Sequence, residues 1–385
     1  MVGGRAILMV DPRALEHLGR AHDIVLVSGT NGKTTTTHLL AAALGAAGPV
    51  VTNTQGANLP PGLAAALATS RPSARHAALE VDEAWLGRVA AATHPKAAVL
   101  LNLSRDQLDR NNEVRRLASA WRDVFAAQRD VAVVANADDP LVVWGAGAAS
   151  RVIWVGAGQP WTADASGCAS CGGRILFRDG SWACSGCSLR RPQLDLWVDG
   201  DRVVTTGGQV WTLQLQLPGR CNTANAALAM AAARELGVDP ASAFAAMAGI
   251  DQVGGRYRSV QLDGVTARLL LAKNPAGWTE VFDQLAPAPA PVVVAINARI
   301  ADGKDPSWLW DVPFERLAGR HVVATGERSR DLAVRLRYAE VDHEREDDMV
   351  AALRRAGPGA VDVVANYTSF QTLAGRLGAL AGSQK

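Results

Sequence analysis

The residues best suited to chemistry form the run Ser28-Gly29-Thr30-Asn31-Gly32-Lys33-Thr34-Thr35, a glycine-rich turn followed by lysine and threonines. A short apolar run, 24–27, precedes it, and a helical pattern, 36–44, follows it. This order of strand, turn and helix is the context of a phosphate-binding loop, in which backbone N–H groups and the helix dipole attract an anion. Lys33 would reach the outer phosphates of a nucleotide, and the Thr34 hydroxyl would coordinate Mg²⁺.

One position departs from the general phosphate-binding pattern. That pattern has a glycine five residues before Gly32, whereas this chain has Val27 there, which leaves the shorter motif Gly-x-x-Gly-Lys-Thr-Thr. The alternative is an ordinary strand-to-helix turn with a surface lysine. The agreement between the flanking pattern and the Gly-Lys-Thr triplet favours a nucleotide site.

Four cysteines have the spacing of a metal site: Cys168-x-x-Cys171 and Cys184-x-x-Cys187, with 12 residues between the pairs. Short turns of this kind let four thiolates converge on one tetrahedral Zn²⁺, and four thiolates leave no open position, so the site is predicted to be structural. Disulfides or inert thiols are the alternative, which a reducing cytosol disfavours. Cys221 is interpreted as a small buried residue near a helix start rather than a nucleophile.

These residues must be held by secondary structure, and the first half of the chain alternates strand and helix patterns. Five further strand candidates follow the one before the loop, with helical segments between most of them; they lie at 50–52, 76–81, 97–101, 131–135 and 151–155. The alternation predicts a mostly parallel, doubly wound α/β sheet. In such a sheet, ligands bind beyond the carboxyl ends of the strands.

Polar side chains collect at those strand ends. A nucleotide site needs carboxylates and amides there to hold Mg²⁺ and ribose. Glu80 is the first choice for a Mg²⁺ contact, although each polar residue taken singly is more often a turn or helix cap. Because four such polar strand ends lie on one edge of the predicted sheet, the group as a whole favours a nucleotide site over turns and caps. The candidates are Asn53, Asn58, Glu80, Asn102 and Asp106, and the fifth strand ends in Asn136-Ala137-Asp138-Asp139-Pro140.

Length and composition limit the possible functions. A chain of 385 residues fits two domains or three. Its net charge of +2 provides no strong field for nucleic acid, so no nucleic-acid partner is expected. No apolar run approaches the ~20 residues of a membrane span. Residues 1–20 are predicted to be a short helical lead-in without a signal-peptide pattern, so we expect a cytoplasmic protein.

A second strand–helix pattern follows a break at Gly254-Gly255-Arg256. Strand candidates and helical segments alternate there, at 267–272, 292–297, 321–325 and 361–365 for strands and at 329–338 and 347–355 for helices. This pattern predicts a second, smaller α/β domain of Rossmann-like type. The expected domains are therefore 1–253, with a cysteine insert at about 164–191, and 254–385.

Several motifs together resemble the Mur ligase family over about 20–250: the loop at 29–35, the segment 102–110, the run 136–140 and Gly219-Arg220-Cys221-Asn222-Thr223-Ala224-Asn225. That family joins an amine to a carboxylate through an acyl phosphate made from ATP, so the resemblance implies a phosphate-binding central domain that uses ATP and Mg²⁺. It also implies an adenine-side role for Asn222 and Asn225, which lie one helical turn apart. Arg256, at the break between the domains, is a further nucleotide-binding candidate.

Two features depart from the family pattern. Many amino-acid-adding members have Asp-His where this chain has Asp106-Gln107, which leaves a second Mg²⁺ site without one of its usual residues. Only about 20 residues precede the first strand, where most members have a domain that holds a UDP-linked precursor. A soluble UDP-peptide substrate is therefore not expected.

The second half is similar to one branch of the family, the ligase subunits of lipid II isoglutaminyl synthases. The similar segments are Lys273-Asn274-Pro275, 302–311, 326–338 and Asn366-Tyr367-Thr368, and the cysteine insert agrees with them. That branch amidates the α-carboxyl of D-glutamate in the stem peptide of lipid II, with ammonia from a separate glutaminase subunit of the GatD type. The resemblance implies the same reaction and partner here, at the inner face of the cell membrane.

The resemblance also implies that an aspartate of the C-terminal domain completes the Cys-His pair of the glutaminase. Asp302, Asp305 and Asp311 are the candidates, and Asp305 is the first choice although the sequence does not separate the three. The alternative is a cluster of turn and cap residues around Gly303 and Pro306.

Two other functions fit the same motifs. One is an amino-acid-adding or polyglutamate-adding ligase of the same fold, which needs an amino-acid pocket and no glutaminase. The other is a nucleotide-binding zinc scaffold without activity. In either ligase, Lys33 and Glu80 are the expected catalytic residues, because phosphoryl transfer depends on positioning and charge stabilisation.

Overall fold

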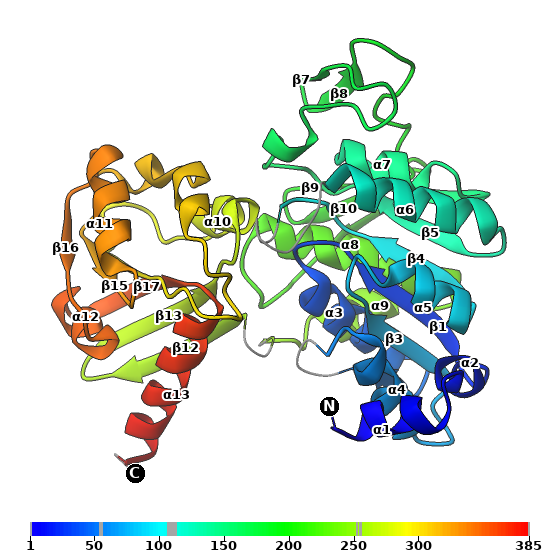
Figure 1. Cartoon of the computed structure of the whole chain (residues 1–385), viewed down its shortest axis with the longest axis horizontal. Helices are drawn as coiled ribbons and strands as arrows, with labels where there is room; N and C mark the ends of the chain where they lie inside the picture. The colour runs from blue at the N-terminus through cyan, green and yellow to red at the C-terminus, as the bar shows by residue number, and fades with distance from the viewer. Residues whose placement is uncertain (1, 54–56, 106–113, 252, 254–255, 384–385) are drawn as a thin grey trace. The chain divides into compact units, whose positions relative to one another are not determined.

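The computed structural model describes residues 2–53, 57–105, 114–251, 253 and 256–383. The chain forms two compact units, of which the first comprises Met1–Ser104 and Glu113–Asp251 and the second contains Gln252–Lys385. Each unit is a sheet covered by helices (Figure 1), as the predicted α/β class requires.

The first unit is built on a nine-stranded sheet in the order β11-β10-β9-β6-β5-β4-β1-β3-β2. Six consecutive strands, from β6 to the edge strand β2, pair in parallel and confirm the predicted doubly wound arrangement. They are rich in Val, Ala and Leu, and most of their residues are buried, as is typical of parallel strands between two helical layers. These strands are β1 (Asp23–Ser28), β2 (Val50–Thr52), β3 (His76–Glu80), β4 (Ala97–Leu100), β5 (Ala132–Asn136) and β6 (Arg151–Gly156).

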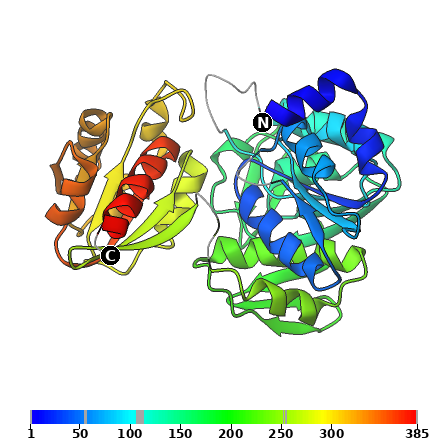
Figure 2. The ribbon, with the colours of Figure 1, turned by 90° about the horizontal axis from the view of Figure 1, so that it is seen from below.

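Helices cover both faces of this sheet (Figure 2). On one face α3 (Lys33–Gly45), α8 (Arg220–Glu235) and α9 (Pro240–Met247) pack against one another. The other face carries the right-handed crossovers that return along the sheet. Those helices are α4 (Pro60–Ala68), α5 (Leu86–Thr93), α6 (Val114–Ala127) and α7 (Pro140–Ala146), and the chain begins with α1 (Val2–Val10) and α2 (Ala14–Gly19).

A small hairpin is inserted between β6 and the antiparallel edge of the sheet. The hairpin consists of β7 (Ile175–Arg178) and β8 (Ser181–Cys184), after a short turn, η1 (Ala163–Ala165). The chain then re-enters the sheet at β9 (Leu196–Asp199), which pairs in parallel with the last residues of β6 through Val155↔Leu196 and Gly156↔Trp197. The antiparallel strands β10 (Arg202–Thr205) and β11 (Val210–Thr212) complete the edge.

The second unit has a six-stranded sheet in the order β12-β13-β17-β14-β15-β16. All neighbouring strands are parallel except the hairpin of β12 and β13. One hydrophobic cluster lies on each face of the sheet, so this unit has its own core. The strands are β12 (Tyr257–Leu262), β13 (Val265–Leu271), β14 (Val292–Ala295), β15 (Val322–Thr325), β16 (His343–Arg345) and β17 (Gly359–Ala365).

Four helices and two short 3₁₀ turns surround that sheet: α10 (Pro275–Phe282), η2 (Ser307–Asp311), η3 (Phe314–Leu317), α11 (Ser329–Tyr338), α12 (Met349–Arg355) and α13 (Tyr367–Ser383). Within the described part of the chain, no helix has both the length and the apolar content needed to cross a bilayer.

Candidate active site

The loop between β1 and α3 has the backbone geometry of a phosphate-binding turn. Gly32 caps α3 with φ 86°, and Gly29 has φ 145°, both in the region that favours glycine. A Cβ at Gly29 would lie 2.9 Å from Leu101 Cβ, so a larger residue would displace the loop from the end of β4. Thr34 and Thr35 belong to the first turn of α3, the part of a helix whose backbone N–H groups are available to an anion.

The loop is held against the segment that follows β4. The Asn31 backbone N–H donates to Asn102 Oδ1 (2.9 Å), and Asn102 Nδ2 donates to the Asn31 carbonyl (3.0 Å). The Thr30 hydroxyl donates to the Ser104 carbonyl (3.1 Å) and accepts from the Ser104 backbone N–H (3.0 Å). Asn102 therefore holds the loop in position through two hydrogen bonds.

Lys33 lies buried in the mouth of the loop, with 7% of its surface exposed. Its Nζ donates to the carbonyls of Gly29 (2.5 Å) and Thr30 (3.1 Å), and to Glu83 Oε2 (3.0 Å). Glu83 is itself held by Trp121 of α6, whose indole N–H donates to the Glu83 carbonyl (2.9 Å). The sequence reasoning did not choose Glu83, although it lies only three residues after Glu80 at the end of the same strand.

Glu80 ends β3 beside the loop and is 1% exposed. Its Oε2 accepts from the Thr34 hydroxyl (2.9 Å) and its Oε1 from Asn58 Nδ2 (3.2 Å). Asn53 does not reach the carboxylate; it donates to the Glu80 carbonyl and accepts from the Glu80 backbone N–H, both at 2.8 Å. Three of the predicted residues thus converge on Glu80.

This group of oxygen atoms fits a hard divalent cation. The Thr34 hydroxyl and the Glu80 carboxylate are adjacent, and a second carboxylate, Glu83, neutralises the lysine beside them. Carboxylate and hydroxyl oxygens with one or two protein ligands are what Mg²⁺ uses when a nucleotide supplies the remaining oxygens. Thr34 and Glu80 are the residues that would hold the ion.

The start of α8 brings two predicted asparagines to the same loop. Asn225 Oδ1 lies 3.0 Å from the position that a Cβ on Gly32 would take, and Asn225 Nδ2 donates to Asn222 Oδ1 at 3.4 Å. Cys221, in the first turn of α8, is only partly buried, which corrects its interpretation as a buried residue. Asp106 lies outside the described residues. Arg256 directly precedes β12 in the second unit.

The polar residues after β5 are hydrogen-bonded to the segment after β4 that holds the loop. Asp139 caps α7, is fully buried, and accepts from the backbone N–H of Leu141 (2.9 Å) and of Leu103 (2.8 Å), next to Asn102. Gln159 Nε2 also donates to it (3.2 Å). Burial raises the pKa of Asp139 to about 6, although its backbone hydrogen bonds oppose the shift.

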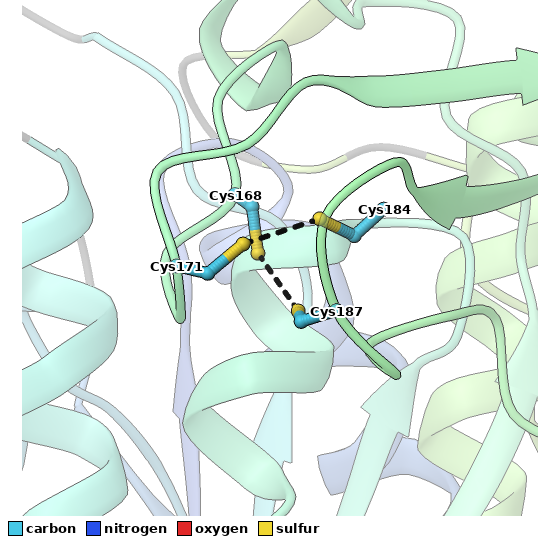
Figure 3. Close-up of side chains that lie close together, drawn as sticks. All are labelled: Cys168, Cys171, Cys184 and Cys187. Carbon is cyan, nitrogen blue, oxygen red and sulfur yellow. Dashed lines mark hydrogen bonds between the residues drawn. The ribbon is translucent and has the colours of Figure 1, made fainter.

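The four cysteines converge as a metal site would require (Figure 3). Their sulfur atoms all lie within 4.8 Å of one another, with 3.7 Å between Cys168 Sγ and Cys187 Sγ and 3.5 Å between Cys171 Sγ and Cys184 Sγ. A tetrahedral Zn²⁺ with 2.3 Å bonds would set these separations at about 3.8 Å. All are free thiols, and the Gly186 backbone N–H lowers the pKa of Cys184 to about 7. The donor set fits Zn²⁺.

The three aspartates of the second unit have different surroundings. Asp302 is buried, and its Oδ1 accepts from the backbone N–H of Thr368 (2.8 Å) in the first turn of α13. Asp305 is exposed, and its Oδ1 accepts a hydrogen bond from the backbone N–H of Ser307, two residues further along the chain (2.9 Å). Asp311 is exposed at the end of η2. Asp302 is therefore a cap for α13, as the turn-and-cap alternative expects.

Sequence comparison decides the family. Residues 27–233 match the Mur ligase middle domain family, and residues 271–370 match the MurT ligase C-terminal family. The chain is 31% identical to the MurT subunit of lipid II isoglutaminyl synthase (glutamine-hydrolyzing) from Streptococcus pneumoniae, over 89% of this chain and 83% of that one. The chain belongs to the MurT branch of the Mur ligase family.

Two further similarities concern the family and the fold. The Staphylococcus aureus (strain N315) MurT subunit is 29% identical over 95% of this chain and 90% of its own length. Among solved structures, a pseudomurein peptide ligase type C from Methanothermus fervidus superposes with a TM-score of 0.71 at 18% identity, covering 91% of this chain and 77% of that one. The latter supports the Mur ligase fold.

Proposed function

We propose that this chain is the ligase subunit of an enzyme that amidates the α-carboxyl of D-glutamate in the stem peptide of lipid II, through an acyl phosphate made from ATP. The observation that carries the proposal is the buried group of Lys33, Thr34, Glu80 and Glu83 at the mouth of the loop, in a chain of MurT type. The lipid substrate would place the reaction at the inner face of the cell membrane.

The side chains supply positioning and charge rather than a nucleophile. Bound ATP·Mg²⁺ would supply the phosphoryl group that activates the carboxylate. Lys33 would neutralise negative charge on the transferring phosphoryl group, since its ammonium already lies at the loop carbonyls. Glu80 and Thr34 would hold the metal, and Asn222 and Asn225 would lie on the adenine side of the nucleotide.

Ammonia would come from a glutaminase partner of the GatD type, because the MurT relatives are named as subunits of a glutamine-hydrolyzing enzyme. We propose Asp305 as the residue that completes the partner's catalytic Cys-His pair. Its carboxylate is exposed, whereas the Asp302 carboxylate is occupied by α13.

An exposed aromatic pair formed by η2 and α11 of the same unit suits such a partner. Trp310 and Tyr338 are 55% and 73% exposed, and their rings meet edge to face at 5.3 Å. Arg335 is buried, with 6% of its surface exposed, and its Cζ atom lies 5.8 Å from the centre of the Trp310 ring, which it helps to hold in place. Exposed Tyr and Trp side chains are among those that most often carry the binding energy of protein interfaces.

The deciding experiment is co-purification with the glutaminase subunit encoded by the same organism, followed by amidation of lipid II with ATP and glutamine. Lys33→Met should abolish the product, while Lys96→Met, which removes an exposed lysine elsewhere on this unit, should not. A complex without amidated product would reject lipid II as the substrate. If no complex forms and free amino acids stimulate ATP hydrolysis, the chain is an amino-acid-adding ligase instead.

A further inference from the structure

An open cavity of about 980 Å³ lies in the first unit, where the cysteine hairpin meets the ends of β5 and β6. We call it the ribbon cavity. Its lining includes Asp138, Gly158 and Gln159 from the strand ends, residues 177–182 from the hairpin, and Arg191, Gln193, Leu194, Trp197, Val198 and Arg220. A cavity of this size holds a ligand much larger than a single phosphate group. None of the residues proposed to bind ATP lines it.

The hairpin wall of the ribbon cavity is fixed to the sheet. Trp182 is 3% exposed, and its indole N–H donates to the Ala137 carbonyl at 3.0 Å, directly after β5. Cys168, Ile175 and Trp182 pack with Val143 of α7 in one hydrophobic cluster. The wall is therefore formed before any ligand arrives, which reduces the entropic cost of binding.

The ribbon cavity carries an excess of guanidinium groups. Arg191 Nε donates to Asp138 Oδ1 (2.5 Å), which neutralises the buried carboxylate of the wall. Arg220 lies against Gly158, where a Cβ would be 1.8 Å from Arg220 NH2. Arg178, the last residue of β7, also lines the cavity. In the described part of the chain neither Arg178 nor Arg220 forms an ion pair, and the acidic residues of the lining are Asp138 and Asp179. Guanidinium forks match phosphate oxygens in pairs.

The remaining lining suits a sugar. Phe177 and Trp197 are half-buried, so their rings are partly accessible, and they offer flat apolar surfaces. Gln159 and Gln193 add amide groups that both donate and accept hydrogen bonds, as hydroxyl groups need. Flat rings, amides and guanidinium groups in one cavity match a sugar that carries a diphosphate.

The ribbon cavity and the nucleotide loop share one edge of the sheet. Gln159 of the cavity wall donates to Asp139 Oδ2, which also accepts from the Leu103 backbone N–H (2.8 Å). The next residue, Ser104, holds Thr30 of the loop. Three hydrogen-bonded contacts, Gln159–Asp139, Asp139–Leu103 and Ser104–Thr30, therefore connect the cavity wall to the proposed site of phosphoryl transfer.

We propose that the ribbon cavity binds the glycosyl diphosphate part of the substrate. This proposal rests on the proposed function, because a lipid-linked muropeptide carries the reacting carboxylate on its peptide and the diphosphate on its sugar. The two groups are separated by part of the peptide and require separate subsites on one surface. The cysteine hairpin then has a binding role in addition to its metal.

The test reverses one charge at the rim and compares it with a matched variant. Arg178→Glu changes the cavity rim, and Arg174→Glu makes the same change on the same hairpin outside the lining. In the complex with the glutaminase subunit, Arg178→Glu should raise the KM for lipid II by about tenfold to a hundredfold, the usual worth of charge-assisted hydrogen bonds, and leave the KM for ATP unchanged. Arg174→Glu should leave both unchanged.

A second measurement separates this proposal from the amidation itself. UDP-N-acetylglucosamine, a soluble glycosyl diphosphate, is titrated into the full chain and into Arg178→Glu, with ADP as competitor. Weaker binding to the variant and no competition by ADP supports the cavity even if lipid II is not amidated. An equal rise in the KM for ATP, or competition by ADP, assigns the cavity to the nucleotide and overturns the proposal. Unchanged KM for lipid II and unchanged probe binding also overturn it.

Discussion

Glu80 and Glu83 lie three residues apart at the end of β3, yet each carboxylate faces a different partner. Glu80 accepts from Thr34 and Asn58, whereas Glu83 forms an ion pair with Lys33. Both pairs are buried. Solvent therefore does not screen the change in electrostatic interaction when either carboxylate is replaced by an amide. Substitution of the two residues should therefore change different kinetic properties of the enzyme.

We expect Glu80→Gln to raise the Mg²⁺ concentration that half-saturates ATP turnover by more than about tenfold, because a neutral amide is a weak ligand for a hard cation. Glu83→Gln should leave that Mg²⁺ concentration nearly unchanged and lower kcat by about tenfold to a hundredfold, because Lys33 loses a charge-assisted hydrogen bond. Steady-state kinetics over a Mg²⁺ series checks both. Equal Mg²⁺ curves for the two variants would contradict the separate roles.

Because the pKa of Asp139 is raised by burial, the free energy of unfolding should fall as the pH rises. Its pKa is raised by burial from the usual 3.8 to about 6, so its contribution to stability is complete below 3.8 and is lost as the pH rises through about 6. The difference corresponds to about 3 kcal/mol. Urea unfolding from pH 4 to pH 7 should show this loss for the wild type relative to Asp139→Asn. A constant difference between the two proteins across that range would show that the carboxyl does not titrate in this way.

At the scale of elements, the sequence predicted most of the strands and helices but not all of them. The parallel strands are recognisable because both faces are buried and their side chains are nearly all apolar. By contrast, β16 is three residues long, His-Glu-Arg at a sheet edge, and carries no apolar pattern. β10 and β12 are also absent from the prediction, and four of the six residues of β12 are at least partly exposed.

The same distinction applies to the site. Glycine, lysine and threonine in fixed order identify the loop, and the cysteine spacing identifies the hairpin, because local chemistry demands those residues. Glu83 has no such local pattern: its partner, Lys33, is 50 residues away in the chain. The capping role of Asp302 depends likewise on Thr368, 66 residues away. Contacts of this kind become visible only when the strands are assembled.

The hairpin with four cysteines should depend on all four thiolates. Cys184→Ser removes one ligand, so purified protein should contain well under one Zn²⁺ per chain by metal analysis. Cys221→Ser is the matched control, since it also exchanges a thiol for a hydroxyl but lies outside the cluster, and it should retain the metal. Loss of metal from both variants, or from neither, would show that the cluster does not bind Zn²⁺ as proposed.

The start of α13 separates the aspartates of the second unit. Asp302→Ala removes an acceptor for the first turn of this helix and should lower the free energy of unfolding by about 0.5–2 kcal/mol. Asp305→Ala should leave stability within about 0.5 kcal/mol and abolish glutamine hydrolysis by the complex. Chemical unfolding and a glutaminase assay on both variants check this assignment. A stable Asp302→Ala that loses glutaminase activity would transfer the partner role to Asp302.

For the whole molecule, the two units raise the question of independent folding. The second unit contains hydrophobic clusters on both faces of its sheet, built from its own strands and helices. We propose that residues 256–385 form an autonomous domain, close to the division expected from the break near residue 254. Expressed alone, this fragment should give a dispersed NMR spectrum and one cooperative unfolding transition. A fragment without cooperative unfolding would show that it needs the first unit.

The register between β6 and β9 has a consequence for how such a chain can be rebuilt. Val155 pairs with Leu196, so the segment that carries the cysteine hairpin leaves the sheet and re-enters it on neighbouring strands, about 4.8 Å apart. Because the two strands are parallel, a connection of about a dozen residues could join them without changing the pairing of any strand. The same two points would accept another module whose ends lie close together, at a small cost in chain entropy. We therefore expect that a different recognition module could be inserted between β6 and β9 while the sequence of the catalytic loop stays unchanged.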